Sequence, residues 1–179
     1  MAEYKTPVTG HAFRYAGILS AAAIFLLIIT YVFDATNSMV IGILNWIIML
    51  AGFSYSGYKF RQEKLDGYIS YGKSFAVIFQ TGLLFGLITM VYVFIHYSMI
   101  DPGALNEMLH YQLEKTIEAR PSLTQEELDA IKNWQKEFIL TWWGLGISQF
   151  ISGVFWGLIV GLIASLVLKK EHPNASPFK

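Results

Sequence analysis

Three residues with metal-ligand chemistry share one predicted helical face. Glu107, His110 and Glu114 follow one another at spacings of three and four, which places carboxylate and imidazole groups side by side. Such groups bind ions like Zn²⁺. One histidine between acids on a hydrated helix is more often a solvated face, so we predict no metal and no other cofactor, and keep these residues as weak candidates only. No residue pattern elsewhere predicts a catalytic site.

Amide side chains occur inside long apolar segments at Asn45, Gln80 and Gln149. At membrane depth, such groups can hydrogen-bond between helices, contributing about 0.6 kcal/mol each. They can also line a path for a solute. No carboxylate or ammonium accompanies them within those segments, whereas coupled transporters and proton relays usually keep one. The pattern therefore favours helix packing, with a solute path as the alternative.

Small residues recur every fourth position near the end of the chain, at Gly153, Gly157, Gly161 and Ser165. Positions four apart lie along one helix face, and the missing side chains leave a groove for another backbone. A shorter pair, Gly82 and Gly86, occurs in the preceding apolar segment. We expect these two stripes to pack within one protomer, and a homodimer contact is the alternative.

These residues lie in or between four long runs that contain no Asp, Glu, Lys or Arg. Each run is long enough to cross a hydrocarbon layer of roughly 30 Å as a helix. A charge at the centre of a spanning helix costs about 2.5 to 3.5 kcal/mol, which explains the segregation of charge. We predict an all-α membrane protein, a single membrane domain over residues 1–179, with four transmembrane helices over about 15–33, 39–58, 75–98 and 139–168.

Composition excludes several classes of protein. The formal net charge is zero, so no excess of Lys and Arg is left to bind nucleic acid. The chain has no cysteine, which excludes disulfides and thiol nucleophiles. The first apolar run is longer than the core of an export signal and lacks a small-residue cleavage site, so we expect it to remain in the mature protein.

The distribution of basic residues predicts orientation. Nine of the Lys and Arg residues lie before the first run, between the second and third, or after the fourth, from Lys5 to Lys179. The third connection holds four basic residues against eight acidic ones. The positive-inside rule therefore predicts that both termini are cytoplasmic and that the third connection is extracytoplasmic.

That connection, residues 101–137, has the pattern of a helical hairpin. Asp101 before Pro102 predicts an N-cap with proline in the first turn. Thr124 and Glu127 form a predicted capping box for a second helix. No breaker follows it, so we expect this helix to continue directly into the fourth span and to project beyond the membrane.

The order of these parts resembles a known family. An inner stretch Tyr58-Lys59-Phe60-Arg61, the segment from Gly67 to Gly72 leading into the third span, and Asp101-Pro102 opening an acidic helical insert are similar to bacterial integral-membrane proteins of domain-of-unknown-function family 4199. The resemblance covers nearly the whole chain. It implies a bacterial inner membrane and a periplasmic hairpin, and it supplies no activity.

We therefore predict a non-enzymatic inner-membrane protein that acts as an interaction or assembly component. The expected partners are the lipid bilayer, a protein bound through the hairpin and a second copy of the chain, with no nucleic acid. A small-solute channel or transporter is the alternative, and a membrane-bound enzyme is the second alternative.

Overall fold

The computed structural model describes residues 7–33, 35 and 38–170. Lys5 and Lys179, two of the basic residues that predict the orientation, lie outside the described residues. The described part is helical, with no strand in it and one isolated antiparallel bridge between Ile69 and Lys170.

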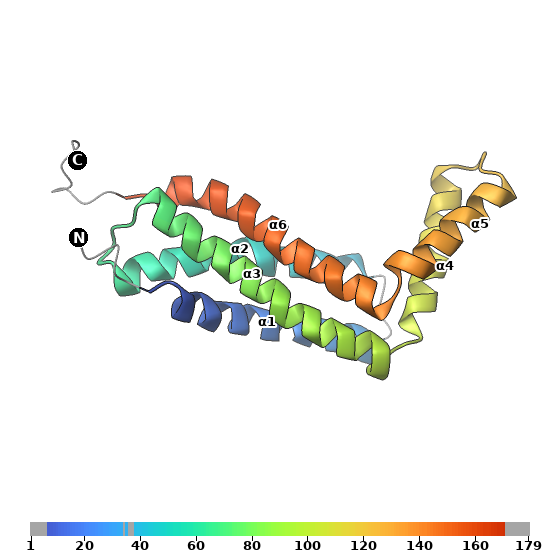
Figure 1. Cartoon of the computed structure of the whole chain (residues 1–179), viewed down its shortest axis with the longest axis horizontal. Helices are drawn as coiled ribbons and strands as arrows, with labels where there is room; N and C mark the ends of the chain where they lie inside the picture. The colour runs from blue at the N-terminus through green and yellow to red at the C-terminus, as the bar shows by residue number, and fades with distance from the viewer. Residues whose placement is uncertain (1–6, 34, 36–37, 171–179) are drawn as a thin grey trace.

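Four helices are long and apolar enough to cross a membrane, which confirms the predicted class of a multi-pass membrane protein. They lie side by side in one bundle (Figure 1). The four helices are α1 (Thr9–Val32), α2 (Met39–Lys64), α3 (Tyr71–Ile95) and α6 (Trp142–Leu168).

The helices do not end where the uncharged runs end. α1 begins at Thr9, before Arg14, and α2 continues past Lys59 to Lys64. Charge marks the depth of the hydrocarbon layer, whereas helical hydrogen bonding continues into the headgroup region and the water beyond it. The membrane-crossing parts of α1 and α2 are therefore shorter than the helices themselves.

α3 is the central helix of the bundle, because it contacts α1, α2 and α6, while α2 also contacts α1 and α6. The main core lies between these helices and includes Met49, Phe53, Ile78 and Phe85, all nearly inaccessible to solvent. The rings of Phe53 and Phe85 meet edge to face, with their centroids 5.4 Å apart.

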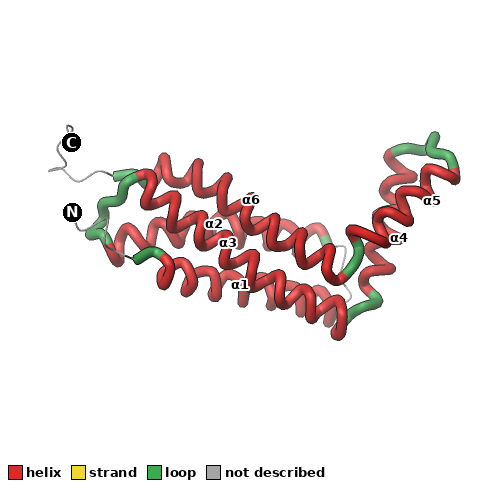
Figure 2. Tube along the Cα trace, viewed as in Figure 1, coloured by secondary structure: helices red, strands yellow, loops and turns green. Residues whose placement is uncertain are grey.

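The connection between α2 and α3 is short and turns sharply. Asp66 and Gly67 both have positive φ, of 49° and 84°, a conformation that glycine adopts readily in turns and that aspartate tolerates better than most residues. Ile69 and Lys170 then exchange two backbone hydrogen bonds of 2.9 Å each. This pairing fixes the end of α6 to the start of α3, at the end of the bundle where α1 begins (Figure 2).

A helical hairpin stands at the opposite end of the bundle (Figure 1). It consists of α4 (Ala104–Ala119) and α5 (Gln125–Trp134). Two π-helical turns connect it to the spans: η2 (His96–Ile100) after α3 and η3 (Gln135–Ile139) after α5. The hairpin is thus joined to the bundle through an irregular turn on each side.

The predicted capping box of the second hairpin helix is confirmed, whereas the predicted start of the first is wrong by two residues: α4 begins at Ala104 with Gly103 as its N-cap, so Asp101 and Pro102 precede the helix. The Asp101 carboxylate accepts a hydrogen bond from the Ala104 backbone N–H at 3.1 Å. Thr124 and Glu127 form a reciprocal capping box at the start of α5. These side chains satisfy backbone donors that a helix start leaves free.

The prediction of a continuous helix from the hairpin into the fourth span is wrong. Leu140 leaves the helical region at φ −89° and ψ 55°, and Thr141 is extended. The Thr141 hydroxyl accepts a hydrogen bond from the Gly144 N–H at 2.9 Å and so begins α6 anew. Because of this break, the hairpin projects across the long axis of the bundle instead of prolonging α6 (Figure 1).

Candidate functional site

The glycines of α3 and α6 face one another within the chain. A Cβ built on Gly82 would lie 2.6 Å from the Cα of Gly157, and one on Gly153 would lie 2.6 Å from the Cα of Gly86. Contacts this short leave no room for a methyl group between the two backbones. The glycine stripe therefore forms a seam inside one protomer in this structure.

The seam continues toward the end where α1 begins. Gly161 packs beneath Phe75, whose ring would lie 3.0 Å from an added Cβ. One turn further, Ser165 is fully buried, and its hydroxyl has no hydrogen-bond partner in the described part of the chain. Ser74 on α3 has the same property.

The three intramembrane amides separate into two places. Gln80 accepts a hydrogen bond from the Thr9 hydroxyl at 3.4 Å, which joins α3 to α1. Asn45 and Gln149 both line a cavity in the half of the bundle next to the hairpin. Within the described residues, no side-chain hydrogen bond joins either of these two amides to another helix.

We call this space the polar cavity, and its volume is about 510 Å³. All four spans and the hairpin helix α4 contribute to its walls, and the lining contains no Asp, Glu, Lys, Arg or His. Its polar lining residues are Thr30, Ser38, Asn45, Thr89, Tyr92, Tyr97, Ser148, Gln149 and Ser152, and its apolar ones include Ile24, Leu27, Ile41, Val93, Met108 and Leu145.

A buried histidine, for which no role was predicted from the sequence, supports one wall of the polar cavity. His96 is buried at the end of α3, and its Nδ1 lies 3.4 Å from the hydroxyl of Tyr92. Its ring also meets those of Tyr31 and Tyr97 edge to face. His96 therefore holds the Tyr92 hydroxyl in place beside the cavity.

A second unforeseen polar group ties α1, α2 and α3 together at the other end of the bundle. Nε2 of His11 lies 3.0 Å from the carbonyl oxygen of Ser56. The Ser56 hydroxyl lies 3.1 Å from that of Thr81 and also bonds to the Phe53 carbonyl. All of the side chains in this group are buried, so it is a structural link between three helices.

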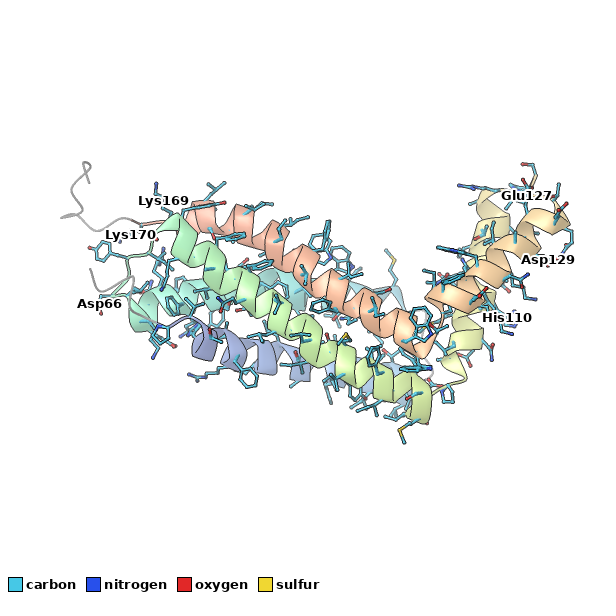
Figure 3. All side chains as sticks on the ribbon, viewed as in Figure 1. Asp66, His110, Glu127, Asp129, Lys169 and Lys170 are labelled. Atoms are coloured by element: carbon cyan, nitrogen blue, oxygen red, sulfur yellow. The ribbon has the colours of Figure 1, made fainter. Side chains whose placement is uncertain are left out.

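Charged side chains are found both on the hairpin and at the far end of the bundle. Figure 3 shows His110, Glu127 and Asp129 on it, whereas Asp66, Lys169 and Lys170 lie at the far end of the bundle. Glu107, His110 and Glu114 are exposed on α4. Among the described residues, no three His, Asp or Glu side chains form a group able to hold a metal ion.

Two charged groups of the hairpin have shifted pKa values. Hydrogen bonds from the Thr124 backbone and hydroxyl stabilise the carboxylate of Glu127 and lower its pKa. The hydrogen bond from Lys115 to Glu118, 2.7 Å long, raises the pKa of the lysine. Both interactions stabilise the hairpin locally.

α5 is strongly amphipathic, but none of its side chains is buried. Trp134 is 57% exposed, and Phe138 in the following π turn is 48% exposed. A hollow of about 250 Å³ lies where the hairpin meets α6, lined by Lys136, Trp142 and Trp143 among others. The hairpin thus presents an uncovered aromatic surface, and a separate hollow lies at its junction with α6.

No curated protein and no solved structure shows significant similarity to the chain. A family model described as "Protein of unknown function (DUF4199)" matches residues 14–170, which include most of the first span, the other three spans and the hairpin. The match confirms the resemblance drawn from the sequence. The chain therefore belongs to the DUF4199 family of proteins of unknown function.

Proposed function

We propose that this chain is a non-enzymatic interaction component of the bacterial inner membrane, and that its hairpin binds a partner protein outside the cytoplasm. The exposure of Trp134 at the end of α5 and of Phe138 in the π turn after it, two elements that bury none of their side chains, carries this proposal. Covering an aromatic side chain is favourable by about 25 cal/mol per Å² of apolar surface removed from water. Aromatic residues are also enriched among those that dominate binding energy at interfaces.

The charge of the hairpin supports a protein partner over adsorption to lipid. Segment 101–137 carries eight acidic and four basic residues. Anionic lipid headgroups repel such a surface, whereas a partner with a basic rim around an apolar centre complements it. We therefore assign the aromatic surface to a protein with a basic contact face.

The hollow beside α6 offers a place for a side chain of that partner. Trp142 and Trp143 form part of its wall, and Lys136 provides one positive charge at its edge. Anchors that fill a pocket usually contribute most to affinity. An apolar or acidic side chain of the partner matches this lining.

The orientation that we propose has both termini in the cytoplasm and the hairpin in the periplasm. It is supported by the basic residues at the end of the bundle away from the hairpin, among them Lys169 and Lys170 (Figure 3).

Because the chain has no cysteine, single cysteines report orientation without background. We expect Ser122→Cys in the hairpin to react with an impermeant maleimide on spheroplasts, and Asp66→Cys to react only after lysis. The opposite labelling pattern would show that the hairpin lies in the cytoplasm and would contradict the proposal.

A photocrosslinking experiment in cells tests the interaction. A photoreactive amino acid replaces Trp134, and a matched control replaces Lys132, which is exposed two residues earlier and points to the other side of the helix. We expect one defined protein adduct from position 134 only, weakened by added salt because the surfaces carry opposite charge. Equal adducts from both positions, or adducts with lipid alone, would contradict the proposal.

A further inference from the structure

We propose that the polar cavity between the four spans is a binding site for an uncharged amphipathic lipid. The lipid would place a hydroxyl or carbonyl head on Asn45 and Gln149 and its apolar body on the rest of the lining. This site is separate from the aromatic surface of the hairpin, so the inference does not depend on the proposed function.

The two amides supply the first argument. Asn45 comes from α2 and Gln149 from α6, and both face the same cavity. No side-chain hydrogen bond to either is found among the described residues. An amide at membrane depth without a partner is unfavourable, and a ligand with hydrogen-bonding groups relieves that penalty.

Tyr92 adds a third polar group to the same wall. Its hydroxyl lies 3.4 Å from Nδ1 of the buried His96, which restricts its position. The side chains of Thr30 and Thr89, by contrast, bond to carbonyls of their own helices at 2.9 and 2.8 Å. The groups left to bind a ligand are therefore mainly the two amides, the tyrosine and the serines at the cavity wall.

The residues that line the cavity indicate an uncharged ligand. It contains no ionisable side chain other than the two tyrosines. A charged headgroup in this cavity would lie at low dielectric without an opposite charge, which is strongly unfavourable. An uncharged head meets hydrogen-bonding groups of matching polarity.

The apolar residues of the lining indicate that the ligand has an apolar body. Val93, Tyr97 and Ala104 form a buried cluster at the hairpin end of the cavity, with Met108 and Leu145 packed against it. A fully polar solute would meet this apolar cluster, whereas a molecule with an apolar body matches it. The cavity is partly open, and its volume of about 510 Å³ falls within the range of small-ligand pockets, roughly 300 to 1,000 Å³, so it would hold the head and part of the apolar body of a longer lipid.

Photolabelling of the full chain tests the site. The protein is reconstituted into phosphatidylcholine nanodiscs that contain a diacylglycerol with a diazirine in one acyl chain. Phosphatidic acid with the same acyl chains serves as the charged comparison. We expect the diacylglycerol to label residues 145–152 more strongly than the phosphatidic acid does, and unlabelled diacylglycerol to compete.

Matched variants locate the head of the ligand. Asn45→Leu and Gln149→Met remove an amide with little change in size, and each is expected to reduce labelling about fivefold, as the loss of one hydrogen bond predicts. Gln80→Met is the control, because Gln80 lies outside the cavity and bonds to Thr9. Its labelling should equal that of the unmodified chain.

Three results would overturn the inference. The first is equal labelling of residues 145–152 by the neutral and the charged probe. The second is an equal effect of Gln80→Met and Gln149→Met. The third is a failure of unlabelled diacylglycerol to compete on the unmodified chain, a measurement that does not depend on whether any variant folds.

Discussion

Replacement of Gly153 by alanine should destabilise the bundle through the contact between α3 and α6. The added Cβ would lie 2.6 Å from the Cα of Gly86 and 2.7 Å from the carbonyl oxygen of Gly82, whereas ordinary contact begins at 3.4 Å. The obstructing atoms belong to backbone, so no side chain can rotate away. The two helices must move apart by about 0.8 Å, a strain of the kind that costs about 1 to 3 kcal/mol.

Gly17→Ala on α1 is the matched control, because a Cβ at Gly17 has no atom within 4 Å. Both substitutions change helix propensity in the same way, so this contribution cancels in the comparison. We expect the Gly153→Ala chain to be less stable than the Gly17→Ala chain by about 2 kcal/mol.

Unfolding in mixed micelles with increasing SDS, followed by tryptophan fluorescence, measures this difference. Trp46 and Trp156 are suitable reporters, since their rings join α2 to α6 with centroids 4.4 Å apart. Equal midpoints for the two variants would refute the argument. A bulkier change, Gly157→Leu, should unfold the bundle, and dissociation of an oligomer without unfolding would instead assign the seam to a contact between protomers.

Three further predictions concern the hairpin and the polar links. The lowered pKa of Glu127 means that its contribution to the cap is complete above the unfolded value of about 4.3 and is lost as pH falls through the folded value. The protection factors of the α5 amides against hydrogen exchange should therefore fall below about pH 4, and Thr124→Ala should remove this dependence. Thr141→Ala removes the N-cap of α6 and should lower stability by about 1 kcal/mol in the SDS titration. His11→Phe removes the contact with the Ser56 carbonyl and should lower stability by a similar amount, about 1 kcal/mol, and unchanged unfolding would show that this contact is not stabilising.

The sequence predicts the number of spans well because lipid excludes charge along the whole of each crossing segment. Helix ends are harder to predict, since a charged residue such as Arg14 or Lys59 is compatible with a helix that continues into water. The restart at Thr141 does leave a local signal, a hydroxyl three residues before Gly144, but the apolar periodicity around it continues without interruption.

The polar cavity could not be predicted from local pattern. Asn45 and Gln149 are far apart in the sequence, and their meeting depends on how α2 and α6 cross. The role of His96 is hidden in part for the same reason, because Tyr31 comes from α1, whereas Tyr92 and Tyr97 are its neighbours along the chain. Spacing along one helix identifies a face but not what that face meets.

Met108 belongs to two parts of the molecule at once, since it lies on α4 of the hairpin and also forms part of the wall of the polar cavity. A partner that binds the hairpin and shifts α4 therefore changes the space available to a ligand between the spans. By thermodynamic reciprocity, binding of that ligand changes the affinity of the hairpin for its partner by the same factor. Binding at the hairpin is thus coupled mechanically to the space between the spans, and this coupling requires no change in the glycine seam.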